Sequence, residues 1–321
     1  MACINRCVAI GIAAFNISTA SANCGSAFCS INTDSELKSS ETTPGLVLSL
    51  RYEFVKQDQP RRGTEKVGVL AEPDTHDELQ TTNHNIVLGA DYRFNERWSV
   101  SASLLYIQRK HAHLHNPDEA GMLAGEEPER EEWKFTGIGD ARVIGRYQFS
   151  LGSYVAGIHA GIKLSTGKRD GSNDAGEVAE RTLQLGTGST DLIVGAHLKG
   201  SIAATKLSWF GHAQLQHAIA TKDDFRPGDE LTFDLGVRYA VTESFSAHLQ
   251  LNNRYKRDDS GANGEPEESG GRSIFLSPGL SLMATPAMEI YSYVQVPLYQ
   301  QVNGVQLTQK GSVLVGANYR F

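Results

Sequence analysis

The sequence predicts an all-β fold, a transmembrane antiparallel up-and-down β-barrel of about 12 strands with short periplasmic turns and longer extracellular loops. Three observations predict it. Apolar and polar residues alternate with period two in many segments, which is the pattern of a strand with one apolar face. Aromatic residues gather where short turns join these segments, and the chain ends on an aromatic residue, Phe321. In a bilayer such strands must close into a cylinder, because unpaired backbone groups find no water in the hydrocarbon region.

The end of the chain, QLTQKGSVLVGANYRF, shows the alternation most clearly. Val313, Val315, Ala317, Tyr319 and Phe321 share one face, and the other face is mostly polar. Aromatic rings are favoured at the headgroup level of a bilayer. This segment resembles the closing strand of bacterial outer-membrane β-barrels, whose final aromatic residue belongs to their assembly signal. We therefore expect the barrel-assembly machinery as a partner and the outer membrane of a Gram-negative bacterium as the location.

The other predicted strands repeat the alternation. They cover residues 46–55, 85–94, 98–107, 137–149, 154–164, 184–198, 207–219, 231–241, 245–252, 273–283 and 288–299. Most connections after even-numbered strands are short, at about 3–6 residues. The long, polar connections that follow most odd-numbered strands span 56–82, 108–133, 166–182 and 257–271. This asymmetry is typical of periplasmic turns and extracellular loops.

A weak repeat marks the ends of the even-numbered strands. The segments GADYRF (89–94), IGRYQF (144–149), GVRYAV (236–241) and GANYRF (316–321) each place a tyrosine beside a short turn or the chain end. The strands that follow such turns begin with Trp98, Tyr154 and Phe245. These aromatic residues are therefore expected at one level, as an interfacial girdle requires.

The N-terminal region divides into two parts ahead of the barrel, which covers 45–321. Residues 1–22 have the pattern of a secretory signal peptide, with Arg6, a short apolar core and the cleavage pattern Ala20-Ser21-Ala22. Residues 23–44 are polar and are interpreted as a periplasmic arm or a plug inside the lumen. They contain Cys24 and Cys29, for which a short-loop disulfide in an oxidising compartment is the first interpretation and a two-cysteine metal clip the alternative.

Composition excludes several classes. The chain has 321 residues, a formal net charge of −7 and no apolar run long enough for a helical membrane span. An acidic chain is a poor nucleic-acid binder, so no nucleic acid is expected as a partner. The expected partners are outer-membrane lipid and a small-molecule solute, and no cofactor is expected.

The inward faces of the predicted strands are polar and charged, although much of the negative charge lies in the loops. The candidate lumen-lining residues are Arg51, Glu53, Asp91, Arg93, Asp140, Arg142, Arg146, Lys163, Asp191, Lys199, Asp234, Arg238, Arg254 and Arg320. Two interpretations stay open. The charges pair and fill the lumen as a hydrogen-bonded network, or they line a conducting pore with mild anion preference because the set leans basic.

Two histidine patterns are candidate metal ligands. His111, His113 and His115 fall on one side of an extended segment and offer nitrogen ligands to Zn²⁺ or Cu²⁺, or they are simply part of a polar loop. Four further histidines are phased inward on separate strands. They are His159, His197, His212 and His248.

Enzymatic function finds little support, and we do not expect an enzyme. His217 is phased toward lipid, but no serine can be paired with it from sequence, and G-x-S-x-G is absent. A barrel-embedded lipid-modifying enzyme and a structural or adhesive barrel without transport remain as alternatives.

Several short glycine-rich segments resemble the MetA-pathway of phenol degradation family of outer-membrane proteins. The segments are GIGDARVIGRYQF (137–149), LSTGKRDG (164–171), LQLGTGSTDLIVGAHL (183–198) and VPLYQ (296–300). The resemblance implies an outer-membrane channel or transporter for small solutes, with aromatic compounds as candidates. It supplies no catalytic residues. The opening CGSAFCSINTD is also similar to a start found in such proteins.

Overall fold

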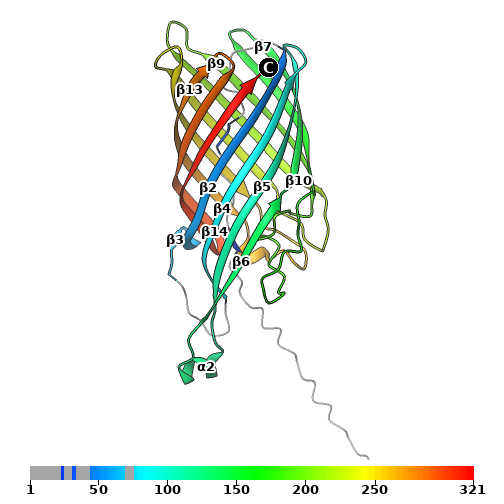
Figure 1. The fold of residues 1–321 in the computed structure, drawn as a ribbon, viewed down its shortest axis with the longest axis vertical. Coiled ribbons are helices and arrows are strands. Elements are labelled where there is room, and N and C mark those ends of the chain that lie inside the picture. Colours follow the sequence, from blue (N-terminus) through cyan, green and yellow to red (C-terminus); the bar gives the residue numbers. More distant parts are fainter. Residues whose placement is uncertain (1–22, 25–30, 34–43, 69–75) are drawn as a thin grey trace, which may run out of the picture.

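The computed structural model describes residues 23–24, 31–33, 44–68 and 76–321. Within these residues, eleven labelled strands form one closed antiparallel ring (Figure 1). The ring strands are β2 (Gly45–Gly63), β4 (His76–Arg93), β5 (Trp98–His115), β7 (Ala141–Leu151), β8 (Tyr154–Leu164), β9 (Thr190–Ser201), β10 (Leu207–Ala220), β11 (Glu230–Ala240), β12 (Phe245–Lys256), β13 (Gly271–Thr285) and β14 (Met288–Arg320). The signal-peptide prediction and Cys29 of the predicted disulfide lie outside the described residues.

The longest strand, β14, spans the height of the barrel twice and so contributes two neighbouring positions to the wall. Residues 288–302 pair with β13 and residues 302–320 pair with β2, antiparallel in both cases. The two arms contact each other, since Arg320 N donates to Ala287 O at 2.8 Å and Gln300 Nε2 donates to Gln309 O at 3.1 Å. Gly304 has a left-handed φ of 54° at the tip between the arms. Counted as two passes, β14 gives the described barrel the twelve wall positions that the sequence predicts.

Three labelled strands and two short helices lie outside this ring. β6 (Glu129–Ile138) continues the wall position of β7, because β5 pairs with β7 over 98–103 and with β6 over 106–115. β1 (Asn23–Cys24) pairs with β14, and β3 (Glu65–Lys66) extends β2. The helices are α2 (Glu119–Ala124) and η1 (Pro266–Glu268). None of the described helices is long and apolar enough to cross a membrane.

The exterior of the ring carries an apolar belt with an aromatic girdle. On β11, for example, Leu231, Phe233, Leu235, Val237 and Tyr239 are all exposed, and the alternate positions face inward. At the short-turn end, aromatic rings contact one another in pairs. The pairs are Trp98–Tyr147 at 4.8 Å, Tyr154–Trp209 at 5.7 Å and Tyr319–Phe321 at 4.8 Å between ring centroids.

The belt has about the height of a bilayer core. Trp98 and Tyr106, both exposed, bound it on β5. The eight residue steps from Trp98 to Tyr106 span about 27 Å along the strand. At a tilt of about 35–45° this corresponds to roughly 20 Å along the membrane normal, slightly less than the ~25 Å apolar band of outer-membrane barrels. Beyond Tyr106 the exposed positions of β5 are Gln108 and Lys110, so the belt ends there.

Short turns and long loops occupy opposite ends, as predicted, and the C-terminus lies at the short-turn end (Figure 1). The predicted loop 108–133 is wrong in part, because 108–115 and 129–133 are strands of a hairpin that projects past the ring and carries α2 at its tip. Residues 56–63 and 76–82 are likewise strands. These extensions leave the bilayer, so their outer faces are polar and the period-two signal disappears.

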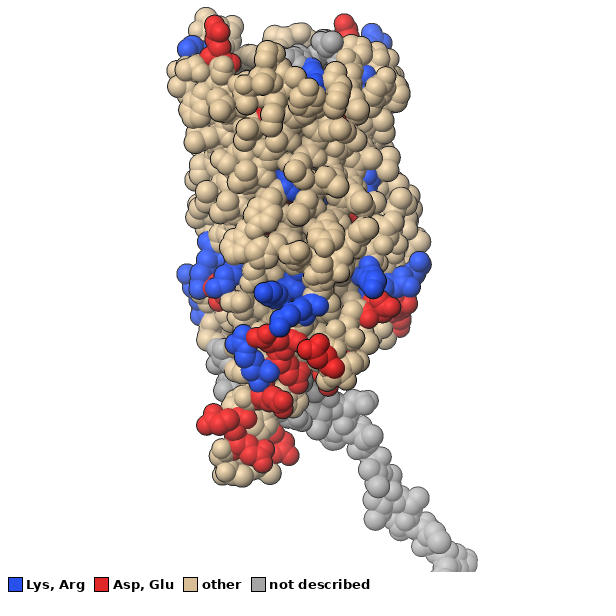
Figure 2. Space-filling model, in the orientation of Figure 1, with Lys and Arg blue, Asp and Glu red and all other residues tan. Residues whose placement is uncertain are grey.

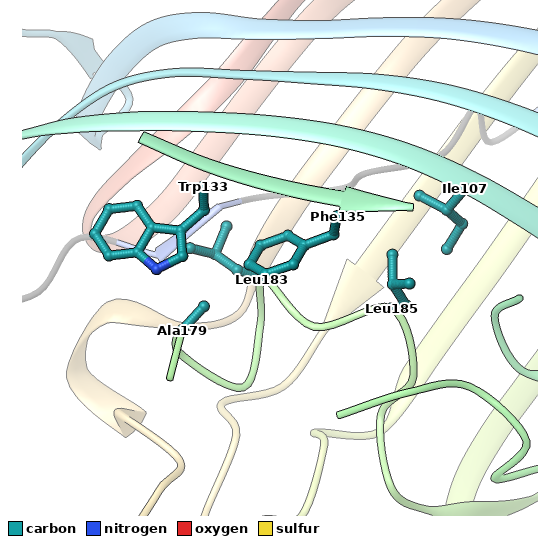
Figure 3. Packing of buried hydrophobic residues seen from close by; sticks show 6 residues of the cluster. All are labelled: Ile107, Trp133, Phe135, Ala179, Leu183 and Leu185. Atoms are coloured by element: carbon teal, nitrogen blue, oxygen red, sulfur yellow. The ribbon is translucent and has the colours of Figure 1, made fainter. Parts of the chain in front are cut away.

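The beginning of the predicted sixth strand is also wrong. β9 begins at Thr190, and residues 183–189 form turns instead. Leu183 and Leu185 are buried against Trp133 and Phe135 of β6 (Figure 3). The apolar residues of this segment therefore cover the inner face of the projecting hairpin and do not face lipid.

Basic and acidic side chains occupy different levels at the long-loop end of the barrel. Figure 2 shows Lys and Arg side chains around the lower barrel and an acidic cluster on the projecting hairpin. Lys110 and Lys134 lie opposite each other in the β5–β6 register, and the exposed Glu126, Glu127 and Glu129 lie nearer the tip. This charged zone marks the limit of the apolar belt.

Candidate functional site: the lumen of the barrel

The inner face of the wall is mostly polar, with a few buried apolar and aromatic side chains. The predicted lumen-lining residues occupy inward positions, and several of their side chains are almost fully buried. The most buried are Glu53, Arg93, Lys163, Asp191, Lys199 and Asp234. Arg142 differs, because it is inward in phase yet exposed, and it acts electrostatically on Glu230 of β11.

Many of these charges are paired. The pairs are Arg51 Nε–Glu53 Oε1 at 2.9 Å, Arg146 Nη1–Asp91 Oδ1 at 3.7 Å, Lys163 Nζ–Asp191 Oδ2 at 2.8 Å, Arg254 Nη2–Glu230 Oε2 at 2.7 Å and His212 Nδ1–Asp234 Oδ2 at 3.3 Å. Sequence reasoning missed Glu230, which begins β11 where a loop was expected to end. Pairing between strands requires the register, which phase alone does not supply.

Lys163 is the centre of the most buried group. Its Nζ lies 3.5 Å from Asp140 Oδ2 and donates to Ser189 Oγ at 3.0 Å. Asp140 in turn accepts from the backbone of Gly167 and Thr187, both at 3.0 Å. This network ties the loop between β8 and β9 to the inner wall.

Arg109 of β5 holds the same loop from the other side. It donates to Asn83 Oδ1 at 2.7 Å and to the carbonyl oxygen of Leu183 at 2.6 Å. The loop between β8 and β9 therefore narrows the long-loop mouth.

A short piece of the N-terminal arm lies against the inner wall. Asn32 N donates to Gln250 Oε1 at 3.1 Å, and Gln250 Nε2 donates to Asn32 O at 2.9 Å. Arg51 donates to Thr33 Oγ1. Residues 31–33, within the predicted periplasmic arm or plug, therefore lie inside the lumen, and 25–30 and 34–43 lie outside the described residues.

Ile31 anchors this piece in an apolar cluster beside Gln250, because Tyr293 of the cluster lies next to His248 of β12. It packs with Val55, Tyr291, Tyr293 and Leu314, all buried. The inward tyrosine rings lie over glycines, since a Cβ on Gly316 would meet the Tyr291 ring at 2.5 Å. Residues 31–33 thus contact the inner wall on β12, β14 and β2.

Two small cavities lie among the described residues of the lumen. A cavity of about 60 Å³ near the long-loop end is lined by Arg254, Lys256, Phe275, Gln300 and Gln309 among others. Another, of about 10 Å³, lies beside Arg238, His248 and Gln250. Each of these two cavities holds a few water molecules at most.

The inward histidines do not form a ring. His159 and His212 stack with centroids 5.1 Å apart, and His197 lies opposite His212 in the register. His248 contacts Ser281 Oγ at 2.9 Å on another part of the wall. On the exterior, His217 Nδ1 lies 2.6 Å from Asp229 Oδ1, and among the described residues no serine hydrogen-bonds to His217.

The predicted metal-ligating group is only partly assembled. His111 and His113 come together with Glu78, which the sequence prediction lacked, and His115 is not in this group. Glu78 lies in a segment expected as a loop, and a β-bulge between Glu78 and Gln80 changes its phase. Only the register between β4 and β5 identifies Glu78 as a member of this group, because it places Glu78 opposite His113.

The long-loop end also holds a carboxyl group with a shifted pKa. Burial, followed by the nearby charges of Glu265 and Glu267, raises the pKa of Glu268 from 4.5 to about 7. Glu268 lies against the β14 tip at Gly304. Its contribution to stability is fully present below pH 4.5 and is lost as pH rises through about 7.

We therefore expect the β14 tip to loosen between pH 4.5 and 7. Backbone amides of residues 303–306, corrected for intrinsic rates, exchange more slowly at pH 5 than at pH 8 in hydrogen-exchange measurements. Glu268→Gln, which stays neutral, removes most of this difference. An equal difference in the variant contradicts the assignment to Glu268.

Comparison with known proteins finds similarity in the fold and no match in the sequence. No sequence-family model and no curated protein sequence matches the chain. The COG4313 outer membrane channel from Pseudomonas putida F1 superposes with a TM-score of 0.64 at 13% identity, covering 88% of this chain and 97% of that one. The NanC porin gives a TM-score of 0.48 at 11% identity, over 85% of this chain and 100% of its own.

These observations define the class. A closed antiparallel ring with an apolar exterior, a girdle of aromatic rings and a polar interior is an outer-membrane β-barrel. The protein is such a barrel, and its fold is that of the P. putida channel.

Proposed function

We propose that this protein is an outer-membrane channel for small solutes, with aromatic or anionic compounds as candidate cargo. The observation that carries the proposal is the arrangement of the lumen: its wall is mostly polar, and residues 31–33 lie inside it, held on the wall by a few hydrogen bonds and one apolar cluster. Hydrogen bonds of this kind contribute about 0.5–1.5 kcal/mol each, so the segment is displaceable. Similarity in fold to an outer membrane channel supports the proposal.

The aromatic part of the proposal comes from the resemblance of 137–149, 164–171, 183–198 and 296–300 to the MetA-pathway of phenol degradation family. Inward Phe210, Phe275, Tyr291 and Tyr293 provide aromatic contacts for such a solute. The strand ending at Phe321 is the proposed signal for the barrel-assembly machinery.

Liposome uptake tests the function. Purified chain is refolded into vesicles, and uptake of a neutral pentose, benzoate and a matched aliphatic carboxylate is compared. We expect uptake of small solutes above that of protein-free vesicles. Failure of all three solutes to enter, with the arm present or removed, favours the alternative of a structural or adhesive barrel.

The anionic part of the proposal rests on the cations of the wall. Arg142 is exposed toward the lumen, and its positive charge attracts anions there. Arg142→Gln is therefore expected to shift the reversal potential in a KCl gradient away from anion preference by several millivolts. Arg130→Gln, on the projecting hairpin, is the control and leaves the reversal potential unchanged. Clear cation selectivity of the unaltered chain rules out the anion preference.

A further inference from the structure

A buried cluster of metal-ligating side chains lies on the inner face of the projecting hairpin. Glu78 comes from β4, and His111 and His113 come from β5, so that two adjacent strands supply one carboxylate and two imidazoles. One ligand atom from each lies within 4.8 Å of the other two. The residues share one face because His111 and His113 are two positions apart and Glu78 faces His113 in the register.

The separations fit a small divalent ion. His111 Nε2 and Glu78 Oε1 lie 3.5 Å apart, with 0% and 3% of their side chains exposed. Ligands about 2.0–2.2 Å from a tetrahedral zinc ion lie roughly 3.4 Å from each other. The pair is therefore already spaced as two ligands of one ion, and His113 requires only a small movement to join them.

The remaining ring nitrogens have orienting partners. His111 Nδ1 lies 2.8 Å from Thr81 Oγ1, which leaves Nε2 directed toward Glu78. His113 Nε2 lies 3.1 Å from Glu131 Oε2. Carboxylates and hydroxyls that hold the second nitrogen of a histidine are the usual surroundings of a metal ligand.

One side of the cluster is packed against the ring of Trp133, which limits side-chain movement and keeps water away from that side. The Trp133 ring lies 4.4 Å from the His113 ring and 5.8 Å from the His111 ring, measured between centroids. Trp133 itself packs with Phe135, Ala179 and Leu183 (Figure 3). Such packing reduces the entropy lost when side chains are fixed around an ion.

The group lies past Tyr106 on β5, outside the apolar belt, so an ion from the surrounding water reaches this level without crossing lipid.

We propose that Glu78, His111 and His113 form a binding site for a divalent transition-metal ion of the zinc class at the extracellular mouth. Two imidazoles and a carboxylate bind zinc in many proteins and leave a fourth position open. The ion would connect β4 and β5 beside the loop that narrows the mouth, so binding would stiffen this part of the entrance.

The test uses the refolded full chain in detergent, stripped with a chelator. Zinc binding is measured by calorimetry, and the geometry is checked by the visible absorption of bound cobalt. We expect the unaltered chain to bind one equivalent of zinc. The isosteric variant Glu78→Gln and the variant His113→Ala are each expected to bind zinc at least about tenfold more weakly, and Glu131→Gln about 10–100-fold more weakly. His115→Ala is the matched control and binds as the unaltered chain does.

Three outcomes overturn the proposal. The first is a folded chain that binds no zinc, with folding shown by heat-dependent gel mobility. The second is a Glu78→Gln variant that binds zinc as tightly as the unaltered chain, and the third is a His115→Ala variant that loses the ion. Each of the three means that zinc does not bind at the proposed site.

Discussion

Removal of residues 23–43 is expected to raise the unitary conductance of the barrel several-fold. The reason is steric: residues 31–33 lie inside the lumen against the wall, where Asn32 is bonded to Gln250 and Ile31 is packed on Tyr291 and Tyr293. Without them a continuous polar interior is left, closed by the backbone ladder of the wall. Single-channel recording of the refolded proteins in planar bilayers measures the difference.

A matched deletion separates this effect from general loosening. Replacing α2 and its flanks (residues 118–125) by a short glycine linker shortens the hairpin tip, which lies outside the lumen, and leaves the conductance unchanged. If removal of the arm changes neither conductance nor the frequency of closures, residues 31–33 do not obstruct the path.

Lys163→Met is expected to destabilise the barrel by about 3–5 kcal/mol, because it leaves buried carboxylates without their shared cation. Lys163 and Asp191 have side chains only 3% and 2% exposed, and Asp140 is the second carboxylate at 3.5 Å. A loss of this size is a large part of the stability of an ordinary domain. Equilibrium unfolding in urea from phospholipid vesicles gives the change in free energy.

The control for this substitution is Lys206→Met in an exposed short turn, which we expect to stay within about 0.5 kcal/mol of the unaltered chain. The triple variant Lys163→Met, Asp140→Asn, Asp191→Asn recovers part of the stability, because no buried charge remains. An unchanged urea midpoint for Lys163→Met means that the network around Lys163 contributes nothing to the folded state.

The sequence predicts the wall well because lipid imposes a strict pattern. Leu231, Phe233 and Leu235 must face acyl chains, and Asp234 between them must not, so phase follows directly from period two. The girdle follows for the same reason, since Trp98 and Tyr147 each begin or end an apolar face beside a short turn. Within the apolar belt, strand number and the lipid or lumen side of a residue therefore follow from the sequence.

The contacts of the interior and the structure of the loops are not predicted by the sequence, because water or protein surrounds these residues and lipid does not. His111 and His113 lie on a strand that has left the bilayer, where no apolar face is needed, and the sequence therefore predicts a loop for this segment. Glu78 joins them only through the β4–β5 register and a bulge. The contact of Asn32 with Gln250 joins residues 218 positions apart, and no local pattern indicates it.

The central claim, that solutes pass through the space lined by the inward residues, is tested most directly by thiol modification during current recording. A chain that begins at Pro44 contains none of the four cysteines, which makes it a suitable background. In that chain Gln250→Cys faces the lumen, whereas Leu249→Cys, one residue earlier, faces lipid. We predict that a charged thiol reagent reduces the current through Gln250→Cys in discrete steps and leaves Leu249→Cys unaffected; block of Leu249→Cys, or full current through a fully modified Gln250→Cys, would contradict the account.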